Sequence, residues 1–495
     1  MNRSLVAVLL CSVAFACSAS REPRPVSKPP VRPPAASSAP VDPEPWRRQR
    51  PPPGEPAELS YPAPEVARLP NGLTLYVLKH KAGIAELMLV VRHGQSSVPE
   101  GKSGLAALTA RMLSEGTRTK PSLALAEAVE SLGSTLETDA GRDHSSVALQ
   151  TLPRDVAEGL ALLAEVVQTP RFDTKDFARV KKEWQDGLLA ERQEPQRLAS
   201  LVGLRLLLGM THGAPVSGSV PDVERLKVGD LRDFHKHYYT PADSALVVVG
   251  DFTLADVKAP VERTLGSWRG RAAEDVPAAQ PQPPSAKKDV VLVDRPDAVQ
   301  TALFSIQAFP KRNVAGHEAR QVLSNLLGGL FTSRINQNLR EKHAFTYGAR
   351  STLMATRAWG AFAVGTSVRT DVTARALEQL GLELSGVAKN TKPLTSPELV
   401  RSKTDLVNDL GAHLEHTGRI AGDLAQSFVQ GLPTDYVSRY APLVASLSLE
   451  NVAQEAKRLN TEQMWIVAVG DAKKIREQLG ARGFAVELAA PALLE

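Results

Sequence analysis

Two long stretches of this chain of 495 residues end in the same way. Residues 245–249 form the apolar run Ala-Leu-Val-Val-Val before a Gly-Asp pair, and residues 465–469 form Trp-Ile-Val-Ala-Val before another. Short apolar runs bounded by turn residues are typical of buried strands. The elements before each run also follow the same order. The two Gly-Asp pairs are separated by the length of a domain rather than by the length of a solenoid repeat. The sequence therefore predicts an internal duplication.

The arrangement of helix and strand patterns predicts the fold class. Helix patterns, such as residues 156–168 and 174–192, are grouped beside strand patterns. Segregated helices beside strands favour an α+β fold. We therefore expect two homologous α/β sandwich domains, each with helices packed on one face of a mostly antiparallel sheet, facing each other across a cleft. The N-terminal domain is expected at 66–272 and the C-terminal domain at 289–495, joined by a Pro-rich linker at 273–288.

The first part of the chain predicts export and a tether. Residues 5–15 are apolar and follow Arg3, a segment too short to span a bilayer but of the length of a signal-peptide core. We therefore predict a signal peptide at 1–16. Residues 17–65 are rich in Pro, Ala, Ser and Arg and lack apolar periodicity, so they are expected to form a disordered Pro-rich linker.

Cys17 allows two interpretations of the cleavage site. Ala14-Phe15-Ala16 is an Ala-x-Ala site for ordinary signal peptidase. Together with Cys17 these residues also resemble the lipobox of bacterial lipoproteins, in which the cysteine is lipidated and becomes the N-terminus, although Leu usually stands where Ala14 is. Cys11 leaves with the signal peptide, and a lone thiol in an oxidising compartment favours lipidation. The expected location is the bacterial periplasm, with a lipid anchor at Cys17.

The overall charge gives no reason to expect a nucleic-acid partner. The chain has 59 Lys and Arg against 54 Asp and Glu, a formal net charge of +5. Spread over a chain of this length, that excess makes no concentrated basic surface. We therefore expect no nucleic acid among the partners.

Residues 104–117 read Gly-Leu-Ala-Ala-Leu-Thr-Ala-Arg-Met-Leu-Ser-Glu-Gly-Thr. This segment resembles the zinc-site helix of the pitrilysin/insulinase peptidases, which carries His-x-x-Glu-His in a Gly-Leu-Ala-His-x-x-Glu-His-Met frame. Two imidazoles four residues apart share a helix face, and the intervening Glu activates a zinc-bound water. Here Ala107 and Arg111 stand at the His positions and Ala110 at the Glu position. Methyl groups cannot ligate a metal and a guanidinium repels one, so we expect no zinc in this chain.

Residues 325–348 carry the most specific positive signal, with Gly-Gly, Ser-Arg-Ile, Leu-Arg-Glu-Lys and a later Tyr. They are similar to the C-terminal-domain signature of the same family. The resemblance implies that Arg340 and Tyr347 match the family's substrate-binding Arg and Tyr, which reach the scissile peptide beside the zinc. A guanidinium offers forked donors to a peptide carbonyl, and a phenol can donate to the oxyanion of a tetrahedral intermediate. Gly328-Gly329 lacks the flanking residues of a phosphate loop and is interpreted as a backbone turn.

Other candidate metal clusters fail on geometry. His413 and His416 lie three apart on a predicted helix, with Glu415 pointing away from their shared face, and we interpret them as polar helix surface. The family's third zinc ligand, a Glu on a later helix, is expected near 177–181, where the sequence has no carboxylate. A self-sufficient zinc peptidase with relocated ligands is therefore the least favoured interpretation.

The resemblance covers about 66–475 and is nearest to the shorter, two-domain, processing-peptidase-like branch of the family. Members of this branch work as dimers, and in some one chain holds zinc while the other brings the Arg and Tyr. The resemblance implies a non-catalytic, substrate-binding subunit of a heterodimeric zinc metalloendopeptidase. It implies zinc in a homologous partner subunit, no cofactor in this chain, and unfolded peptides that add to a sheet edge as substrates. An inactive binding or assembly protein of the same fold is the alternative, which retention of Arg340 and Tyr347 disfavours.

Overall fold

The computed structural model describes residues 59–284 and 289–494, together with Glu44. The predicted signal peptide at 1–16, the lipidation site Cys17 and most of the Pro-rich linker at 17–65 lie outside these residues. Residues 59–494 belong to one compact unit. Within the described residues, no helix combines the length and the apolar character that a bilayer crossing requires.

The first half forms a six-stranded sheet in the order β1-β2-β6-β3-β5-β4. The strands β2 and β6 are parallel, and the other neighbours are antiparallel. As the apolar run predicts, β6 is buried along its whole length, between β2 and β3. The strand bounds are Glu65–Arg68 (β1), Thr74–Lys79 (β2), Ala85–Val91 (β3), Leu136–Ala140 (β4), Ser145–Thr151 (β5) and Ser244–Gly250 (β6).

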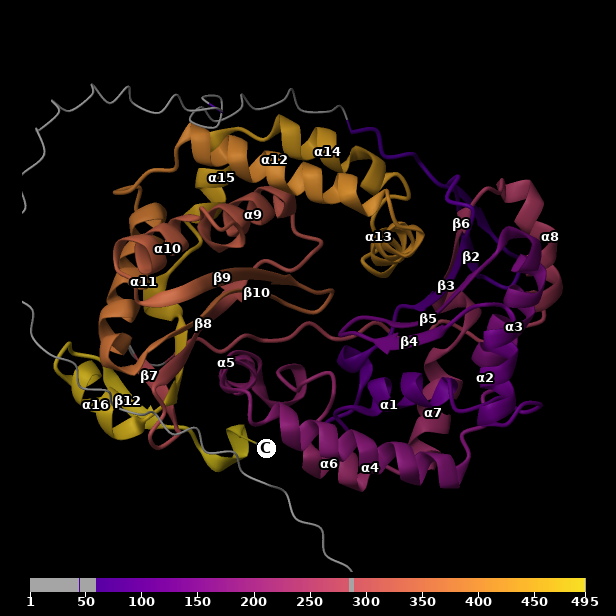
Figure 1. The fold of residues 1–495 in the computed structure, drawn as a ribbon, viewed down its shortest axis with the longest axis horizontal. Helices are drawn as coiled ribbons and strands as arrows, with labels where there is room; N and C mark the ends of the chain where they lie inside the picture. Colours follow the sequence, from indigo (N-terminus) through magenta and orange to yellow (C-terminus); the bar gives the residue numbers. More distant parts are fainter. Residues whose placement is uncertain (1–43, 45–58, 285–288, 495) are drawn as a thin grey trace, which may run out of the picture. The chain divides into compact units, whose positions relative to one another are not determined.

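Helices of the same half cover one face of this sheet (Figure 1). The helix α1 packs against β4 and β5, and α3 packs against β3, β5 and α8. Their apolar faces form one core with the sheet, in which Leu108 and Leu163 are fully buried. The helix bounds are Leu105–Leu113 (α1), Ser122–Ser131 (α2), Val156–Gln168 (α3), Thr174–Glu191 (α4), Pro195–His212 (α5), Val220–Arg225 (α6), Val228–Tyr238 (α7) and Leu254–Leu265 (α8).

The second half forms another six-stranded sheet, in the order β12-β7-β11-β8-β10-β9. Its strands are Asp289–Asp294 (β7), Gln300–Phe309 (β8), Thr346–Ala355 (β9), Gly360–Arg369 (β10), Trp465–Gly470 (β11) and Ala485–Leu488 (β12). Its helices are His317–Ser324 (α9), Arg334–Asn336 (α10), Thr373–Ala388 (α11), Ser396–His413 (α12), Thr417–Val429 (α13), Tyr436–Ser446 (α14), Leu449–Ala456 (α15) and Ala472–Gly480 (α16). Two π-helical turns cover Asn325–Gly329 (η5) and Gln337–Lys342 (η6).

The predicted duplication is present in the topology. The strands β2-β6-β3-β5-β4 and β7-β11-β8-β10-β9 follow the same chain order in the two sheets. Only the outermost strand differs, because β1 precedes β2 and pairs with it antiparallel, whereas β12 comes last and pairs with β7 in parallel. Both sheets are therefore mixed.

Short 3₁₀ turns lie at Gln95–Ser97 (η2), Pro153–Asp155 (η3), Pro241–Asp243 (η4), Thr370–Val372 (η7), Thr461–Gln463 (η8) and Pro491–Leu493 (η9).

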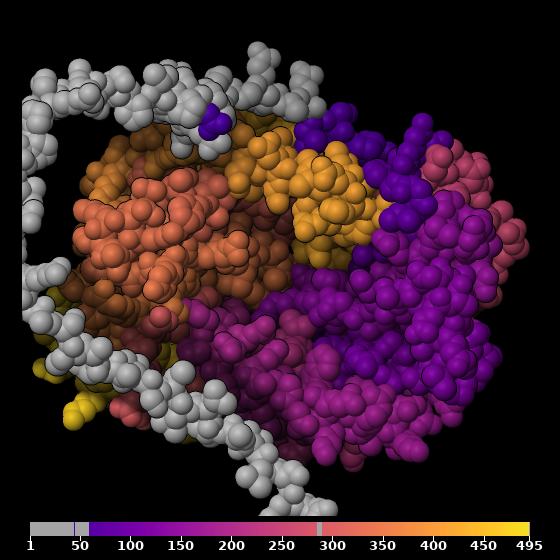
Figure 2. Space-filling view, in the orientation of Figure 1, coloured from indigo at the N-terminus to yellow at the C-terminus, as the bar shows by residue number. Residues whose placement is uncertain are grey.

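The expectation that helices cover only one face of each sheet is wrong. The helix α5, from the first half of the sequence, packs on β8 and β11 of the second sheet, and α13 packs on β3 and β6 of the first. Contact is close, because a Cβ placed on Gly203 of α5 would lie 2.7 Å from Cδ1 of Phe304. Figure 2 shows the orange surface around α13 meeting the violet surface of the first half. The physical reason is that both faces of the central strands are apolar and each needs a cover.

Candidate functional site

The helix α1, which carries the altered motif, is held in place at its N-terminus. Its N-cap Gly104 has φ +88°, and a Cβ there would lie 2.8 Å from the Ser217 carbonyl oxygen. Glycine satisfies both the left-handed backbone and the close approach. The Gly104 amide donates to Oε1 of Gln95 at 3.0 Å, and the Ser103 hydroxyl donates to Asp222 at 2.5 Å. The beginning of α1 is therefore fixed against α6 and the loop that precedes it.

The three motif positions lie on α1 as the sequence predicts. Ala107 is 7% exposed and Ala110 is 1% exposed, so both pack as small core residues on the inner side of the helix. Arg111 is partly exposed, with one guanidinium nitrogen 2.7 Å from Glu115 and 2.6 Å from the Ser114 hydroxyl. A second guanidinium, that of Arg179 on α4, also binds Glu115. The position of the motif is thus occupied by two methyl groups and a closed ion-pair cluster.

This donor set does not fit a zinc ion. The nearby carboxylate, Glu115, is buried and already shared by the guanidinium groups of Arg111 and Arg179. Zinc sites need three or four nitrogen, sulfur or oxygen ligands converging on one point. In residues 59–284 and 289–494, no group of three or more His, Cys, Asp or Glu is arranged to hold a metal.

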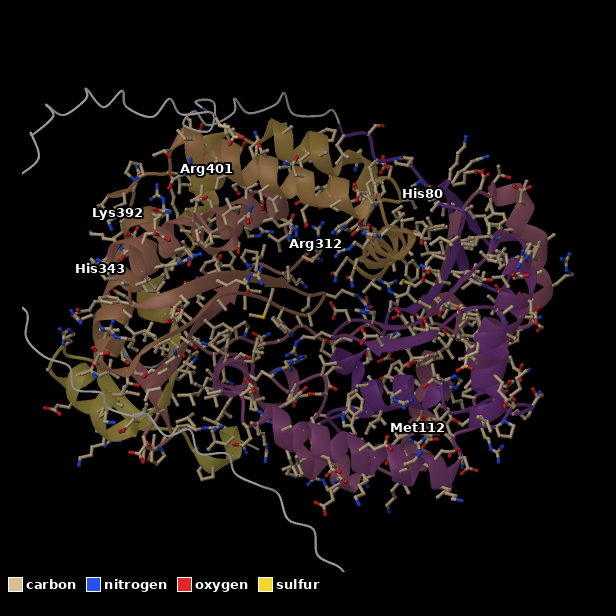
Figure 3. The ribbon with its side chains drawn as sticks, in the orientation of Figure 1. His80, Met112, Arg312, His343, Lys392 and Arg401 are labelled. Atoms are coloured by element: carbon tan, nitrogen blue, oxygen red, sulfur yellow. The ribbon has the colours of Figure 1, made fainter. Side chains whose placement is uncertain are left out.

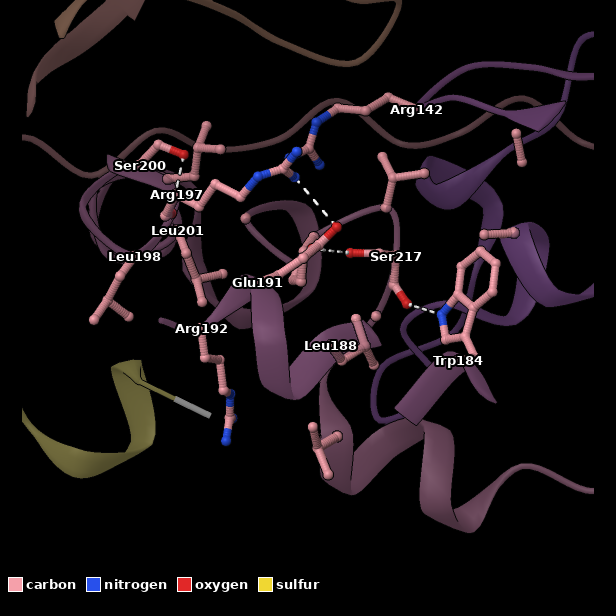
Figure 4. A pocket seen from close by; sticks show the side chains of 18 of the residues that line it. Arg142, Trp184, Leu188, Glu191, Arg192, Arg197, Leu198, Ser200, Leu201 and Ser217 are labelled. Carbon is pink, nitrogen blue, oxygen red and sulfur yellow. Dashed lines mark hydrogen bonds and ion pairs between the residues drawn. The ribbon is translucent and has the colours of Figure 1, made fainter. Parts of the chain in front are cut away.

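A cavity of about 460 Å³ lies against this part of α1 (Figure 4). The edge strand β4 forms part of its wall through Thr138, Asp139 and Ala140. Because β4 is the last strand in its sheet order, its outer backbone groups have no strand partner among the described residues. The remaining lining is Ala107, Arg111, Arg142, Trp184, Leu188, Glu191, Arg192, Arg197, Leu198, Ser200, Leu201, Leu204, Gly213, Pro215, Val216, Ser217, Gly218 and Val220.

The residues of α4 that face this cavity come later than 177–181. Phe177 and Val180 are buried in the core, whereas Trp184, Leu188 and Glu191 line the cavity. Trp184 donates its indole N–H to the Ser217 carbonyl at 2.8 Å. Their spacing of four and three residues is that of one helix face, a pattern that could have identified them from the sequence.

Glu191 is the one carboxylate that α4 contributes to the lining of this cavity. It lies 3.3 Å from the Arg197 guanidinium and accepts a hydrogen bond of 3.4 Å from the Ser217 hydroxyl. Glu191 therefore forms an ion pair with Arg197 in the first turn of α5. A single carboxylate engaged in this way supplies no converging ligand set.

Arg340 and Tyr347 lie in the second half of the chain. Arg340 is in η6, where its guanidinium carbon is 3.8 Å from the centre of the Phe331 ring and Nε is 3.5 Å from Glu341. Phe331 is 63% exposed and packs against the Arg340 guanidinium at the surface. No sequence pattern indicated this contact. Tyr347 is near the start of the edge strand β9 and is 90% exposed. Neither residue lines the cavity beside α1.

The local backbone explains how Arg340 and Tyr347 are brought into neighbouring elements. The Ala344 amide donates to the Arg340 carbonyl at 3.0 Å, and the Phe345 amide donates to the Leu339 carbonyl at 2.8 Å, which turns the chain back into β9. Gly328 lies in a π-helical turn, where a Cβ would be 2.4 Å from the Ser351 nitrogen of β9. Close backbone approach therefore accounts for this glycine. Met112 on α1 and His343 after η6 mark the two signature regions in Figure 3.

His413 and His416 do not share a helix face. The helix α12 ends at His413, and His416 is the N-cap of α13. His413 instead pairs with Asp423 at 3.0 Å, within a cavity of the second half that is lined also by Tyr436. Burial raises the pKa of Asp423, while the hydrogen bond from His413 lowers it. The pair links the helices α12 and α13.

Comparison with known families decides which scaffold this is. Residues 74–202 match the sequence profile described as insulinase (peptidase family M16), and residues 225–406 match the one described as peptidase M16 inactive domain. The chain belongs to the M16 insulinase family. Of the sequence-predicted residues, Ala107, Ala110 and Arg111 lie in the first match, and Arg340 and Tyr347 lie in the second.

Several M16 relatives match much of the chain. The zinc protease PqqE of Helicobacter pylori is 24% identical over 81% of this chain and 91% of its own length. The protein named non-peptidase homolog YmxG, also of Helicobacter pylori, is 23% identical over 55% of this chain and 63% of its own length. An uncharacterized zinc protease of Mycobacterium leprae is 25% identical over 58% of this chain, which spans 64% of that relative.

Solved structures show the same fold. A peptidase M16 inactive domain from Pseudomonas fluorescens is 25% identical, with a TM-score of 0.76 over 82% of this chain and 98% of that one. A protease from Helicobacter pylori has the same TM-score of 0.76 at 18% identity, over 83% of this chain and 100% of that one. Two α/β domains with mixed sheets are thus the fold of the family and of this chain.

Proposed function

We propose that this protein is a non-catalytic, substrate-binding subunit that acts with a zinc-bearing M16 homologue on unfolded peptides. The observation that carries the proposal is the contrast between two sites of the same chain. On α1, the motif positions hold Ala107, Ala110 and an ion-paired Arg111, which can neither bind zinc nor activate water. In the second half, the Arg and Tyr of the other signature are kept at the surface.

Peptide binding is supported by the geometry of the first sheet. The edge strand β4 is paired only with β5 in the described residues, and it forms a wall of the cavity beside α1. An unfolded peptide can add to such an edge as a further strand, because its backbone groups find the unpaired amides and carbonyls. The cavity would then receive side chains on alternate positions of the peptide.

A role in trans is supported by the position of the second signature. Arg340 and Tyr347 do not line the cavity of their own chain, and Tyr347 is 90% exposed. Both residues are therefore available to a second molecule. In the proposed pair, Arg340 would donate to a carbonyl of the peptide held by the zinc-bearing subunit, and Tyr347 would donate to the developing oxyanion.

The first prediction is that the purified protein holds no tightly bound zinc and cleaves no unfolded peptide alone. Ala107, Ala110 and Arg111 provide no ligand and no general base. Metal analysis after dialysis, together with a casein-type degradation assay, tests this. One zinc per chain that is lost together with chelator-sensitive proteolysis would contradict the proposal.

The second prediction concerns the envelope, where we propose that the protein is anchored through lipid on Cys17. The wild type should partition into detergent, because buried lipid chains bind a protein to membranes and detergent micelles. Cys17→Ser should block lipoprotein processing or release soluble protein. Recovery of the wild type wholly in the soluble exported fraction would refute the anchor and leave the peptidase-subunit proposal standing.

A further inference from the structure

The cavity beside α1 is lined by more arginines than carboxylates, and one of these arginines, Arg111, is neutralised by Glu115 outside the lining. Four arginines and two carboxylates line it. One of the carboxylates, Glu191, is engaged by Arg197 and Ser217, and the other, Asp139, has a side chain that is 75% exposed.

Arg142 differs from Arg111 and Arg197, because its guanidinium is bonded to backbone carbonyls rather than to a carboxylate. It follows β4, and its guanidinium donates to two backbone carbonyls, those of His212 at 3.1 Å and Ala214 at 3.0 Å. It also packs over the Trp359 ring, 5.2 Å from the ring centre. Among the described residues, no carboxylate lies within ion-pair distance of this guanidinium. Removal from water lowers the pKa of Arg142 to about 10, so it remains a cation at neutral pH.

The negative charge of the neighbouring Asp143 favours the charged form of Arg142, but the carboxylate is hydrogen-bonded to other groups. Its carboxylate accepts hydrogen bonds from the Ser96 hydroxyl at 3.2 Å, from the Arg357 amide at 2.8 Å and from Gln430 at 3.3 Å. Those bonds point the carboxylate toward other elements. A partly buried cation without a bonded counterion favours the arrival of an anion, because the cost of desolvating the cation has already been met in the fold.

Figure 4 shows a second arginine directed to the same part of the cavity. Arg142 extends from the β4–β5 turn and Arg197 extends from α5, and in this view both guanidinium groups reach the region above Glu191. The side chain of Arg197 is 66% exposed, so it can change partner at small cost. Arg192, by contrast, points away from that region.

We propose that this cavity binds an acidic side chain of a peptide that pairs with β4, with the guanidinium of Arg142 as its counterion and Arg197 as a second donor. The proposal rests on the proposed peptide-binding function and gives it a substrate class. The carboxylate enters from the edge strand, where Thr138 and Ala140 line the cavity. Guanidinium groups suit this role, because they offer paired N–H donors to a carboxylate.

Binding of three matched peptides tests the proposal. Capped peptides of about ten residues of Ser, Thr and Val, long enough to cover the five residues of β4, would differ at one central position only, as Glu, Gln or Lys. Competition against one labelled reference peptide gives their affinities for the full chain. We expect the Glu peptide to bind about tenfold more tightly than the Gln peptide, the effect of one charge-assisted hydrogen bond, and the Lys peptide to bind most weakly.

Variants at Arg142 and Arg197, with one control, locate the effect. Arg142→Met should abolish the preference for Glu over Gln, whereas Arg142→Lys should restore part of the preference. Because Arg142 also holds the loop at 212–214, the exposed Arg197→Gln provides a second variant that should reduce the preference without affecting folding. Arg154→Met, which removes an 80% exposed arginine outside the cavity lining, is the matched control and should change nothing.

The outcomes separate this inference from the proposed function. If none of the three peptides binds, the peptide-binding function itself fails. If they bind with equal affinity, the peptide-binding function stands and the acidic preference is wrong. If the Glu preference persists in both Arg142→Met and Arg197→Gln, the acidic side chain binds elsewhere and the assignment to this cavity is overturned.

Discussion

Tyr347→Phe should lower kcat by roughly 10²-fold in a mixture of this protein with its zinc-bearing homologue, while leaving assembly intact. The change removes one hydroxyl from a side chain that is 90% exposed, so the fold has little to lose. A phenol that donates to an oxyanion acts mainly in the transition state, and its removal therefore affects kcat more than KM. Peptide turnover by the reconstituted pair, with size-exclusion chromatography of the complex, measures both effects.

A second binding-site variant and a control variant test the same interpretation. Arg340→Ala should also raise KM, because its guanidinium is proposed to bind a peptide carbonyl before the reaction. Tyr436→Phe removes a phenol that donates to Glu318 at 2.8 Å within the second half, and it should leave turnover unchanged. Wild-type turnover by Tyr347→Phe in an intact complex would show that Tyr347 is only a strand residue. The inactive binding or assembly protein would then be the better description.

The elements that the sequence predicts well are those whose burial is local and regular. The apolar run at 245–249 forms β6, and the amphipathic pattern at 156–168 forms α3 with its predicted bounds. The motif segment became α1. In each case one face or the whole element is buried within its own half, so the pattern of apolar residues carries the information.

The elements that form the cavity were harder to predict. The strand β4 has the sequence Leu-Glu-Thr-Asp-Ala, in which three of five residues are polar, because Glu137 and Asp139 are exposed and Thr138 lines the cavity. The helix α5 carries an apolar face that has no partner in its own half and packs instead on the second sheet. Its role depends on a contact between distant parts of the sequence, which periodicity cannot show.

Only part of the candidate site could be predicted, because some of its residues depend on contacts between distant parts of the sequence. The motif positions Ala107, Ala110 and Arg111 follow from a spacing on one helix. Arg142 lies in a turn, and its importance comes from the carbonyls of His212 and Ala214, seventy and more residues later. Phe331 likewise gains its role only from the ring contact with Arg340. No local pattern identifies a residue whose partners are brought to it by the fold.

Arg320→Met should destabilise the second half by about 3 kcal/mol, the cost of breaking a buried ion pair. Arg320 is fully buried on α9. Its guanidinium donates to the Ala315 carbonyl at 2.8 Å, to the Val314 carbonyl at 2.5 Å and to Glu455 of α15 at 3.2 Å. Methionine fills much of the same volume but donates to none of these oxygens. The loop before α9 and the contact between α9 and α15 therefore lose their shared donor.

The expected loss of stability is limited, because Glu455 keeps one partner in Arg320→Met. Arg458 still donates to Glu455 at 2.7 Å, so its carboxylate keeps one counterion, and the two loop carbonyls carry most of the loss. A fall in the melting temperature of roughly 3 °C follows, because residues 59–494 form one compact unit and the entropy of unfolding grows with chain length. Arg439→Met, which breaks a solvent-exposed pair with Asp435 at 3.3 Å, is the matched control and should cost less than about 1 kcal/mol. Equal melting temperatures for the two variants would mean that the buried guanidinium contributes no more than a surface ion pair. Hydrogen exchange at 312–316 would then show no loss of protection in Arg320→Met, whereas we expect that loop to exchange first.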